Sequence, residues 1–240
     1  MSFDVEVSSQ EEEEVRRITE YKFLVYFDDP YYKARNGDSL AVEFKSKNPL
    51  EAIRYAMEHL SENRAWKERI VLLGDYIFSS TFIVDIPFIE FLLKGRIKKA
   101  DNLNAYLIHI KDTHDVELRD GVIDGNKENN TLDSPDNSDI VIENSERVRI
   151  CNIHHKDSGG WGIGIIDYSK DVVVEDSILE YARNTQVVIW PPSDKRCENI
   201  VVRNNIIRGG DRHGFNAYYT DRIKIENNII YDTFYEPIYV

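Results

Sequence analysis

Titratable side chains recur in short polar segments of the C-terminal half, each lying just ahead of a short apolar segment. Two carboxyl groups can hydrolyse a glycosidic bond with retention when they are about 5–5.5 Å apart, or with inversion at about 6.5–9.5 Å. Asp157 and Asp211 lie two polar segments apart, which suits inversion, and Glu236 lies in the segment after Asp211. These three residues are candidate catalytic acids, bases or nucleophiles.

A polysaccharide lyase needs a base that removes the proton beside a uronate carboxylate, and a cation that neutralises this carboxylate. His213 could act as the base, and Arg183 or Arg212 could supply the cation. The residues favour neither the hydrolase nor the lyase. Both chemistries need a bound sugar, which aromatic rings and hydrogen-bonding side chains can hold. The candidate substrate-binding residues, in or next to the same segments, are His154, Trp161, Trp190, Asn216 and Tyr218.

Five repeated segments indicate which elements position these residues. In each, alternating apolar residues lead to Asn or Asp and then to aliphatic residues. The segments begin 32, 24, 28 and 23 residues apart, at Val116, Val148, Val172, Ile200 and Ile223. A period in the twenties predicts a solenoid, whose units stack because none can bury its apolar side alone.

A second apolar segment precedes each repeated one. Ile108 and Ile140, for example, each lie 8 residues before the repeats that begin at Val116 and Val148. β-Branched residues are abundant in these segments, and apolar residues do not recur with helical spacing. Two to three short strands in each repeat predict an all-β protein, a parallel β-helix.

Adjacent asparagines interrupt the last repeated segment, "RIKIENNIIYD". The chain must bend between two strands of one coil, and Asn and Asp tolerate the left-handed conformation that such a bend needs. Stacked coils would place these residues in one column, where side chains can hydrogen-bond from coil to coil. The predicted asparagine ladder contains Asn152, Asp176, Asn204 and Asn227.

The chain is expected to have three parts. Residues 1–20 form an acidic arm, residues 21–66 a hairpin and a helix, and residues 67–240 the β-helix, which forms one folding unit with 21–66. "NPLEAIRYAMEHL" predicts an amphipathic helix with Asn48 as N-cap and Pro49 at its first position. "FLVYFDDPYYKARNGDSL" predicts a β-hairpin with Asn36 and Gly37 at its turn.

Over residues 21–240 the chain resembles the right-handed parallel β-helix proteins of the pectate-lyase-like superfamily. "RIVLLGDYIFSSTFIV" is similar to the first coil of these proteins, and "LRDGVIDGN" is similar to a phrase common among them. The likeness is greatest for the branch with a helix before the coils, which includes polygalacturonases, phage tailspikes and archaeal surface proteins. It implies right-handed coils, a helix that covers the N-terminal end of the solenoid, and an extracellular or virion-surface location.

The resemblance also implies where a ligand lies, namely across one strand face and between the loops that leave each coil just before that face. The corresponding loops here are 126–138, 154–161, 181–185, 208–213 and 232–236. "RHG" and "RIK" near the C-terminus match polygalacturonase motifs only in part. Alternation predicts one outward row of His109, Val141, Gly164, Val188, Asn216 and Tyr239, and a second row of Lys111, Glu143, Ile166, Trp190 and Tyr218.

The composition restricts the partners and cofactors. A formal net charge of -13 argues against nucleic acid and against an anionic membrane surface. No cofactor or metal is predicted, because the adjacent His154 and His155 lack a third ligand at metal-like spacing. The acidic loop "DGNKENNTLDSPDNSD" lacks the Asp-x-Asp-x-Asp-Gly spacing of a Ca²⁺ loop.

We therefore predict a protein that binds a polysaccharide, and the sequence leaves open whether it also cleaves that polysaccharide, as a hydrolase or a lyase. The alternative is a non-catalytic structural or adhesive β-helix, such as a virion spike or cell-surface component. The final "EPIYV" resembles the beginning of another coil without a polar cap. We expect that the polypeptide continues, or that another chain covers this end, for example in a homo-oligomer.

Overall fold

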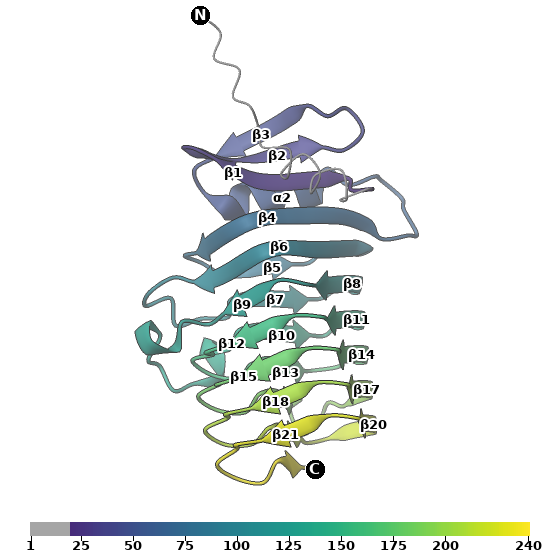
Figure 1. The fold of residues 1–240 in the computed structure, drawn as a ribbon. Helices are drawn as coiled ribbons and strands as arrows, with labels where there is room; N and C mark the ends of the chain where they lie inside the picture. The colour runs from purple at the N-terminus through teal and green to yellow at the C-terminus, as the bar shows by residue number, and fades with distance from the viewer. Residues whose placement is uncertain (1–19) are drawn as a thin grey trace, which may run out of the picture.

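The computed structural model describes residues 20–240, and the predicted acidic arm therefore lies outside the described residues except for Glu20. The described chain is a parallel β-helix, preceded by three antiparallel strands and an α-helix (Figure 1). The predicted fold class is confirmed. This part of the chain contains no helix with the length and hydropathy that a membrane span requires.

The N-terminal strands β1 (Phe23–Asp28), β2 (Tyr31–Asn36) and β3 (Val42–Ser46) form an antiparallel meander. The first turn lies at Asp29 and Pro30, because Asp28 pairs with Tyr31. The predicted hairpin turn at Asn36 and Gly37 is confirmed, because these residues open the turn between the antiparallel strands β2 and β3, where the Asn36 amide donates to the Ala41 carbonyl at 3.0 Å. The turn between β1 and β2 was not predicted, although the proline of "DDP" indicates it, because proline cannot continue a paired strand.

Helix α2 (Pro49–Glu58) packs between this meander and the first coil, as Figure 1 shows. Its predicted cap is confirmed, since the Asn48 side chain accepts a hydrogen bond from the Leu50 amide at 3.0 Å. Ala52, Ile53 and Ala56 are fully buried on one side of the helix. The solenoid itself begins at β4 (Glu68–Phe78), which pairs in parallel with β1 and with β6 (Ile89–Lys99).

The coils contribute strands to three faces. The first face contains β8 (His114–Arg119), β11 (Glu146–Cys151), β14 (Lys170–Glu175), β17 (Cys197–Arg203) and β20 (Thr220–Glu226). The second face contains β9 (Val122–Asp124), β12 (His154–Lys156), β15 (Ile178–Glu180), β18 (Ile206–Arg208) and β21 (Ile229–Tyr231). The third face is a 7-stranded sheet of β5 (Phe82–Val84), β7 (Ile108–Lys111), β10 (Ile140–Glu143), β13 (Ile163–Ile166), β16 (Val187–Ile189), β19 (Phe215–Ala217) and β22 (Ile238–Tyr239).

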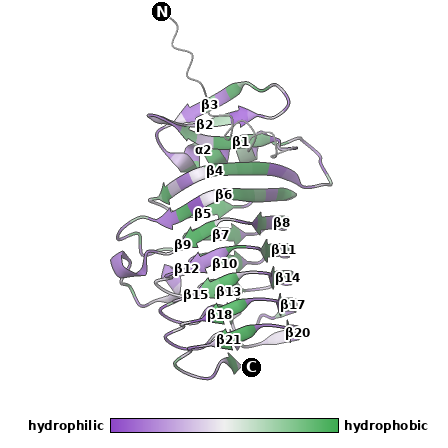
Figure 2. Cartoon of the chain, viewed as in Figure 1, coloured by the Kyte–Doolittle hydropathy of each residue, from purple (hydrophilic) through white to green (hydrophobic). Residues whose placement is uncertain are grey.

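The coils stack in the predicted register. On the first face, parallel pairing joins equivalent residues of successive coils in the order Val116, Val148, Val172, Ile200 and Ile223. On the third face, the outward row pairs in the order His109, Val141, Gly164, Val188, Asn216 and Tyr239. Buried Ile and Val side chains from all three faces fill the interior, and Figure 2 shows hydrophobic residues concentrated in the strands of the coils.

The corner between the first and second faces has the backbone conformation that was predicted. Asn152, Asp176, Asn204 and Asn227 all have φ between 53° and 57°. The Asn152 side chain donates to the carboxylate of Asp120 at 2.7 Å, and Asn204 donates to Asp176 at 3.1 Å. These hydrogen bonds lie on the exposed side of the corner and join pairs of coils.

The second asparagine of each adjacent pair, Asn205 or Asn228, lies on the more buried side of the corner, and the two form a stack. Asn205 is 1% exposed and donates through Nδ2 to the Val174 carbonyl and to Asn228 Oδ1, both at 3.0 Å. Its Oδ1 accepts from the Ser177 amide at 3.0 Å. Buried amides thus satisfy the backbone groups that the bend leaves without ladder partners.

We expect Asn205→Ala to lower the free energy of unfolding by about 1–3 kcal/mol, because it leaves a buried N–H and a buried carbonyl without partners. The matched change Asn204→Gly keeps the positive φ on the exposed side and should cost less than about 1 kcal/mol. Denaturant unfolding of both variants measures the difference. Equal losses would contradict a stabilising role for the buried stack.

Candidate functional site

Five loops join the second face to the third face and form one side of the solenoid, here called the loop flank. It comprises residues 125–139, 157–162, 181–186, 209–214 and 232–237. The longest loop contains two short 3₁₀ helices, η1 (Lys127–Asn129) and η2 (Pro135–Asn137), and Figure 2 shows it as hydrophilic. The prediction that a loop begins at His154 is wrong, because His154–Lys156 form strand β12.

A buried ionic cluster fixes the base of the longest loop. Lys99, Asp139 and His155 are all fully buried. The Lys99 ammonium lies 2.8 Å from Asp139 Oδ1, and His155 Nε2 lies 2.8 Å from Asp139 Oδ2. Lys99 also donates to the main-chain carbonyls of Asn137 at 2.9 Å and Ser138 at 3.2 Å. The cluster ties three coils and the loop together, because its members come from β6, the end of the loop, and β12.

Burial by itself would raise the pKa of the Asp139 carboxyl group, since desolvation penalises its charge. The neighbouring Lys99 and His155 outweigh this effect and hold the pKa of Asp139 below its ordinary value. The carboxylate is therefore charged at neutral pH. Gly125 allows this close packing, because a Cβ at that position would lie 2.1 Å from Asp139 Oδ2.

We expect Lys99→Met to lower the free energy of unfolding by about 3–5 kcal/mol, because it leaves a buried carboxylate without its ammonium partner. The double variant Lys99→Met/Asp139→Asn removes both charges and should recover part of that loss. Denaturant unfolding followed by circular dichroism measures these two variants and the single variant Asp139→Asn. If the double variant were as unstable as the sum of its single changes, the ion pair would not be the cause.

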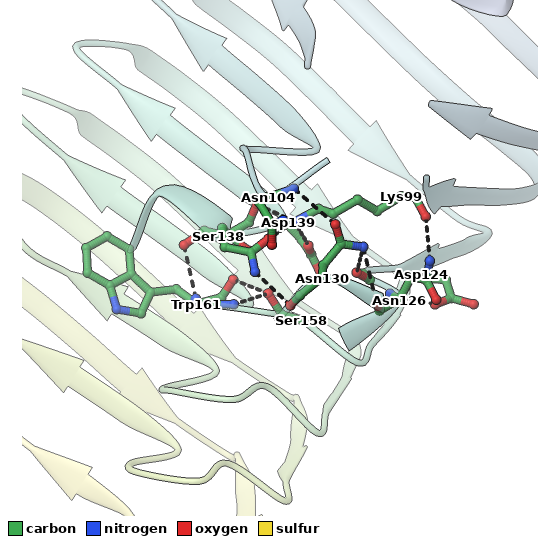
Figure 3. A network of polar contacts seen from close by, with 12 residues as sticks. Lys99, Asn104, Asp124, Asn126, Asn130, Ser138, Asp139, Ser158 and Trp161 are labelled. Atoms are coloured by element: carbon green, nitrogen blue, oxygen red, sulfur yellow. Dashed lines mark hydrogen bonds and ion pairs between the residues drawn. The ribbon is translucent and has the colours of Figure 1, made fainter. Parts of the chain in front are cut away.

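Polar side chains of the longest loop help to hold Trp161 in place (Figure 3). Asn137 donates through Nδ2 to the carbonyls of Asn130 and Leu132, both at 2.9 Å. The Trp161 amide donates to Ser138 Oγ at 3.0 Å, and the Ser158 hydroxyl donates to the Trp161 carbonyl at 2.7 Å. The main chain of Trp161 is therefore held by a serine of its own loop and by a serine of the preceding coil, and these hydrogen bonds set the position of the indole.

An aromatic strip, defined as Trp161, Trp190, Tyr218 and Tyr239, runs along the outside of the third face. Successive ring centroids are 5.9, 5.1 and 5.8 Å apart. Trp161 is only 6% exposed and covers Gly164, whereas Trp190 is 48% exposed and Tyr239 is 46% exposed. Tyr218 is partly buried between them. The three predicted rings thus lie side by side, and the innermost one is a structural support.

The strip is held in place by the hydrogen bonds of the third face. The Trp190 amide donates to the Ile165 carbonyl at 3.0 Å, and the Tyr218 amide donates to the Ile189 carbonyl at 2.9 Å. The side chain of Asn216 lies in the neighbouring outward row, with Nδ2 3.5 Å from the Tyr218 hydroxyl. Predicted residues from three coils therefore meet on one surface.

A hollow of about 670 Å³ lies beside the strip on the loop flank of the last coils. Its charged lining residues are Lys127, Asp211, Arg212 and Asp232, and its aromatic lining residues are Tyr181, Phe234 and Tyr235. Asp211, a candidate acid or base, and Arg212, a candidate cation for a lyase, both belong to this lining. The sequence did not predict that Lys127, Tyr181, Phe234 and Tyr235 would line this hollow, because the conformation of the loops brings them together.

His213 lies between the hollow and the strip. Its ring centroid is 5.6 Å from that of Tyr235 and 5.5 Å from that of Tyr239. Nδ1 lies 3.0 Å from the main-chain carbonyl of Glu236, whose exposed carboxylate is 3.6 Å from the same nitrogen. The structure therefore brings His213, Glu236 and Tyr239 together.

Two other candidate catalytic residues lie elsewhere on the loop flank. Asp157 follows β12 directly, and its carboxylate is 3.9 Å from the Lys156 ammonium. Partial burial raises the pKa of Asp157. Arg183 donates to the carbonyls of Lys127 at 2.9 Å and Asn130 at 3.3 Å, so it clamps the longest loop. Catalytic roles for both residues stay predictions.

His154 does not lie on the predicted ligand-facing surface. It points outward from the second face, where Nε2 is 2.7 Å from Glu180 Oε1. Glu180 is also paired with Arg208. His155, next in the chain, points inward because successive strand residues face opposite sides. Within residues 20–240, no group of three or more His, Cys, Asp or Glu residues is placed to hold a metal ion.

Comparison with known proteins shows the fold. No protein-family model matches the chain, and no curated protein matches it in sequence. The A-module of mannuronan C-5 epimerase AlgE6 from Azotobacter vinelandii superposes with a TM-score of 0.65 at 18% identity, over 80% of this chain and 54% of that module. This chain therefore spans about half the length of the epimerase module.

Two further solved structures share the fold. A proposed glycosyl hydrolase from Parabacteroides merdae gives a TM-score of 0.57 at 13% identity, over 75% of this chain and 89% of its own. PfbA, a surface adhesin of Streptococcus pneumoniae, gives 0.52 at 14% identity, over 75% and 58%. An epimerase, a proposed hydrolase and an adhesin thus share one architecture, and their likeness identifies no chemistry here.

Proposed function

We propose that the protein binds a polysaccharide along the outside of the third face, beside the loop flank, with the aromatic strip as its main contact surface. The observation that carries this proposal is the exposed Trp190 ring between Trp161 and Tyr218. An indole gives a flat apolar surface on which the C–H groups of a sugar ring can pack. The planes of Trp190 and Tyr218 are inclined by 49°, so the two rings do not stack flat on each other.

The surroundings of the strip support the same function. Asn216, His213 and the Tyr239 hydroxyl supply hydrogen-bonding groups beside the rings. Trp161 holds Trp190 in a fixed position with an interplanar angle of 24°, which limits the entropy lost on binding. Among the proteins of similar fold, one is named as an epimerase of mannuronan and one is a proposed glycosyl hydrolase. These similarities support the proposal only at the level of the fold.

We expect Trp190→Ala to weaken polysaccharide binding by roughly tenfold to a hundredfold, because it removes the exposed ring of the strip. Trp66→Ala is the matched control, since Trp66 is 61% exposed but lies between α2 and β4, far along the chain from the strip. Affinity electrophoresis or calorimetry with a panel of neutral and acidic polysaccharides measures binding. Equal behaviour of the two variants would exclude the strip as the contact surface.

Cleavage of the bound polysaccharide is a second candidate function, and the orientation of His213 favours it. With Nδ1–H donated to the Glu236 carbonyl, Nε2 is left as a proton acceptor. Asp211 lines the adjacent hollow together with Arg212. A base, a carboxylate and a guanidinium are therefore available at the end of the strip.

If the protein is an enzyme, Asp211→Asn and His213→Gln should each lower the rate by about a hundredfold or more. New reducing ends identify hydrolysis, and unsaturated products that absorb ultraviolet light identify a lyase. Asp38→Asn, on the exposed N-terminal meander, is the control and should leave the rate unchanged. Binding without either product would instead support a non-catalytic, adhesive role.

A further inference from the structure

We propose that Asn216 selects the sugar that binds to the aromatic strip, and that the ligand is an uncharged, hydroxyl-rich glycan rather than a polyuronate. This inference rests on the proposed polysaccharide binding and specifies the class of polysaccharide. It follows from the buried, unpartnered carbonyl oxygen of the Asn216 side chain, which lies beside the strip, and from the charges around it.

The side chain of Asn216 points away from the solenoid interior but is covered by its neighbours. It points outward from β19, yet it is only 6% exposed, and its Oδ1 has no hydrogen-bond partner among the described residues. Its Nδ2 has one long contact, 3.5 Å from the Tyr218 hydroxyl. The amide is therefore surrounded by the strip and almost unsatisfied, in contrast to Asn205, whose amide is fully used in the interior stack.

The same outward row shows that the fold does not need an amide at this position. Val141, Gly164 and Val188 occupy the equivalent positions of the preceding coils, and all three are buried. A buried acceptor without a partner destabilises the folded state, whereas an apolar residue of similar size does not. Asn216 thus weakens the fold locally, and a bound hydroxyl group that donates to Oδ1 would remove that defect.

A ligand reaches the amide if the Tyr218 ring turns aside. This ring is partly exposed, and its hydroxyl is at the limit of hydrogen-bond distance from Asn216. Rotamer changes of exposed side chains are fast. A sugar hydroxyl can then take the place of the Tyr218 hydroxyl, because it can donate to Oδ1 and accept from Nδ2 at once.

The charges near Asn216 favour a neutral sugar over a uronate. No Lys or Arg points outward from β16, β19 or β22, or from the positions just after β16 and β19. The outward residues there are Val188, Trp190, Asn216, Tyr218 and Tyr239. Recognition of a carboxylate typically uses an Arg or Lys partner, and the nearest basic side chains that the site offers, Lys127 and Arg212, line the hollow rather than the strip. The nearby Glu236 carboxylate and the formal net charge of -13 repel polyanions.

The test compares wild type, Asn216→Val and Trp190→Ala for binding to soluble neutral polysaccharides (glucan, mannan, xylan and galactan) and to two polyuronates (alginate and polygalacturonate). We expect wild type to bind a neutral polymer with little dependence on salt. Asn216→Val should bind that polymer roughly tenfold more weakly, while its melting temperature stays equal to wild type or rises. Tyr218→Phe, which keeps the Asn216 amide, should change the affinity less than Asn216→Val does.

Each other outcome has a defined meaning. If Trp190→Ala loses binding but Asn216→Val binds like wild type, Asn216 is not selective, although the strip still binds glycans. A wild-type preference for alginate or polygalacturonate that weakens with salt overturns the ligand class alone. If Asn216→Val fails to fold, the amide serves the fold and the inference is wrong. If folded wild type binds none of the polymers, polysaccharide binding itself fails.

Discussion

Successive coils of this chain lie in parallel register, so each side chain sits next to the equivalent side chain of the next coil, about 4.8 Å away. The main-chain hydrogen bonds of the three faces enforce this spacing. A residue type that suits one coil is therefore repeated in the next, and its side chains form rows. Residues separated by more than twenty positions become direct neighbours, as Val116 and Val148 do. The corner asparagines, the interior amides and the aromatic strip are all consequences of this one constraint.

The loop flank depends on a second arrangement, which the stacking does not supply. Fifteen residues lie between β9 and β10, and a loop of this length needs tertiary anchors to adopt one conformation. Lys99, Asp139 and His155 provide the anchor inside the solenoid, and Arg183 provides one outside. Burying three polar groups is costly unless they satisfy one another. Here the ion pair between Lys99 and Asp139 and the hydrogen bond between His155 Nε2 and Asp139 Oδ2 offset most of that cost, although His155 Nδ1 has no hydrogen-bond partner among the described residues. The loop in turn positions Trp161 under Trp190.

The chemistry that this surface can support follows from its division into two zones, the aromatic strip on the third face and the hollow on the loop flank. Along the strip the side chains are aromatic or uncharged, which suits sugar contact. Around the hollow, the charged side chains of Lys127, Asp211, Arg212 and Asp232 join three further aromatic side chains. Asp157 lies outside the hollow lining, so the carboxylates of the flank do not gather at one point. Binding therefore has a more continuous structural basis than catalysis, and the fold by itself accommodates both.

The sequence by itself determined the repeat period, the register of the coils, the left-handed corner and the capped helix, because each depends on local residue preferences that recur along the chain. It also identified the rings of the strip, since alternation places Trp190 and Tyr218 in one row. It did not determine which asparagine of each pair is buried, or that His154 and His155 face opposite sides. It could not reveal the cluster around Lys99 and Asp139, whose members are distant in sequence and carry no repeated pattern. Tertiary packing decided these points, because the direction of a side chain at a bend and the burial of a charge depend on neighbours that only the folded coils supply.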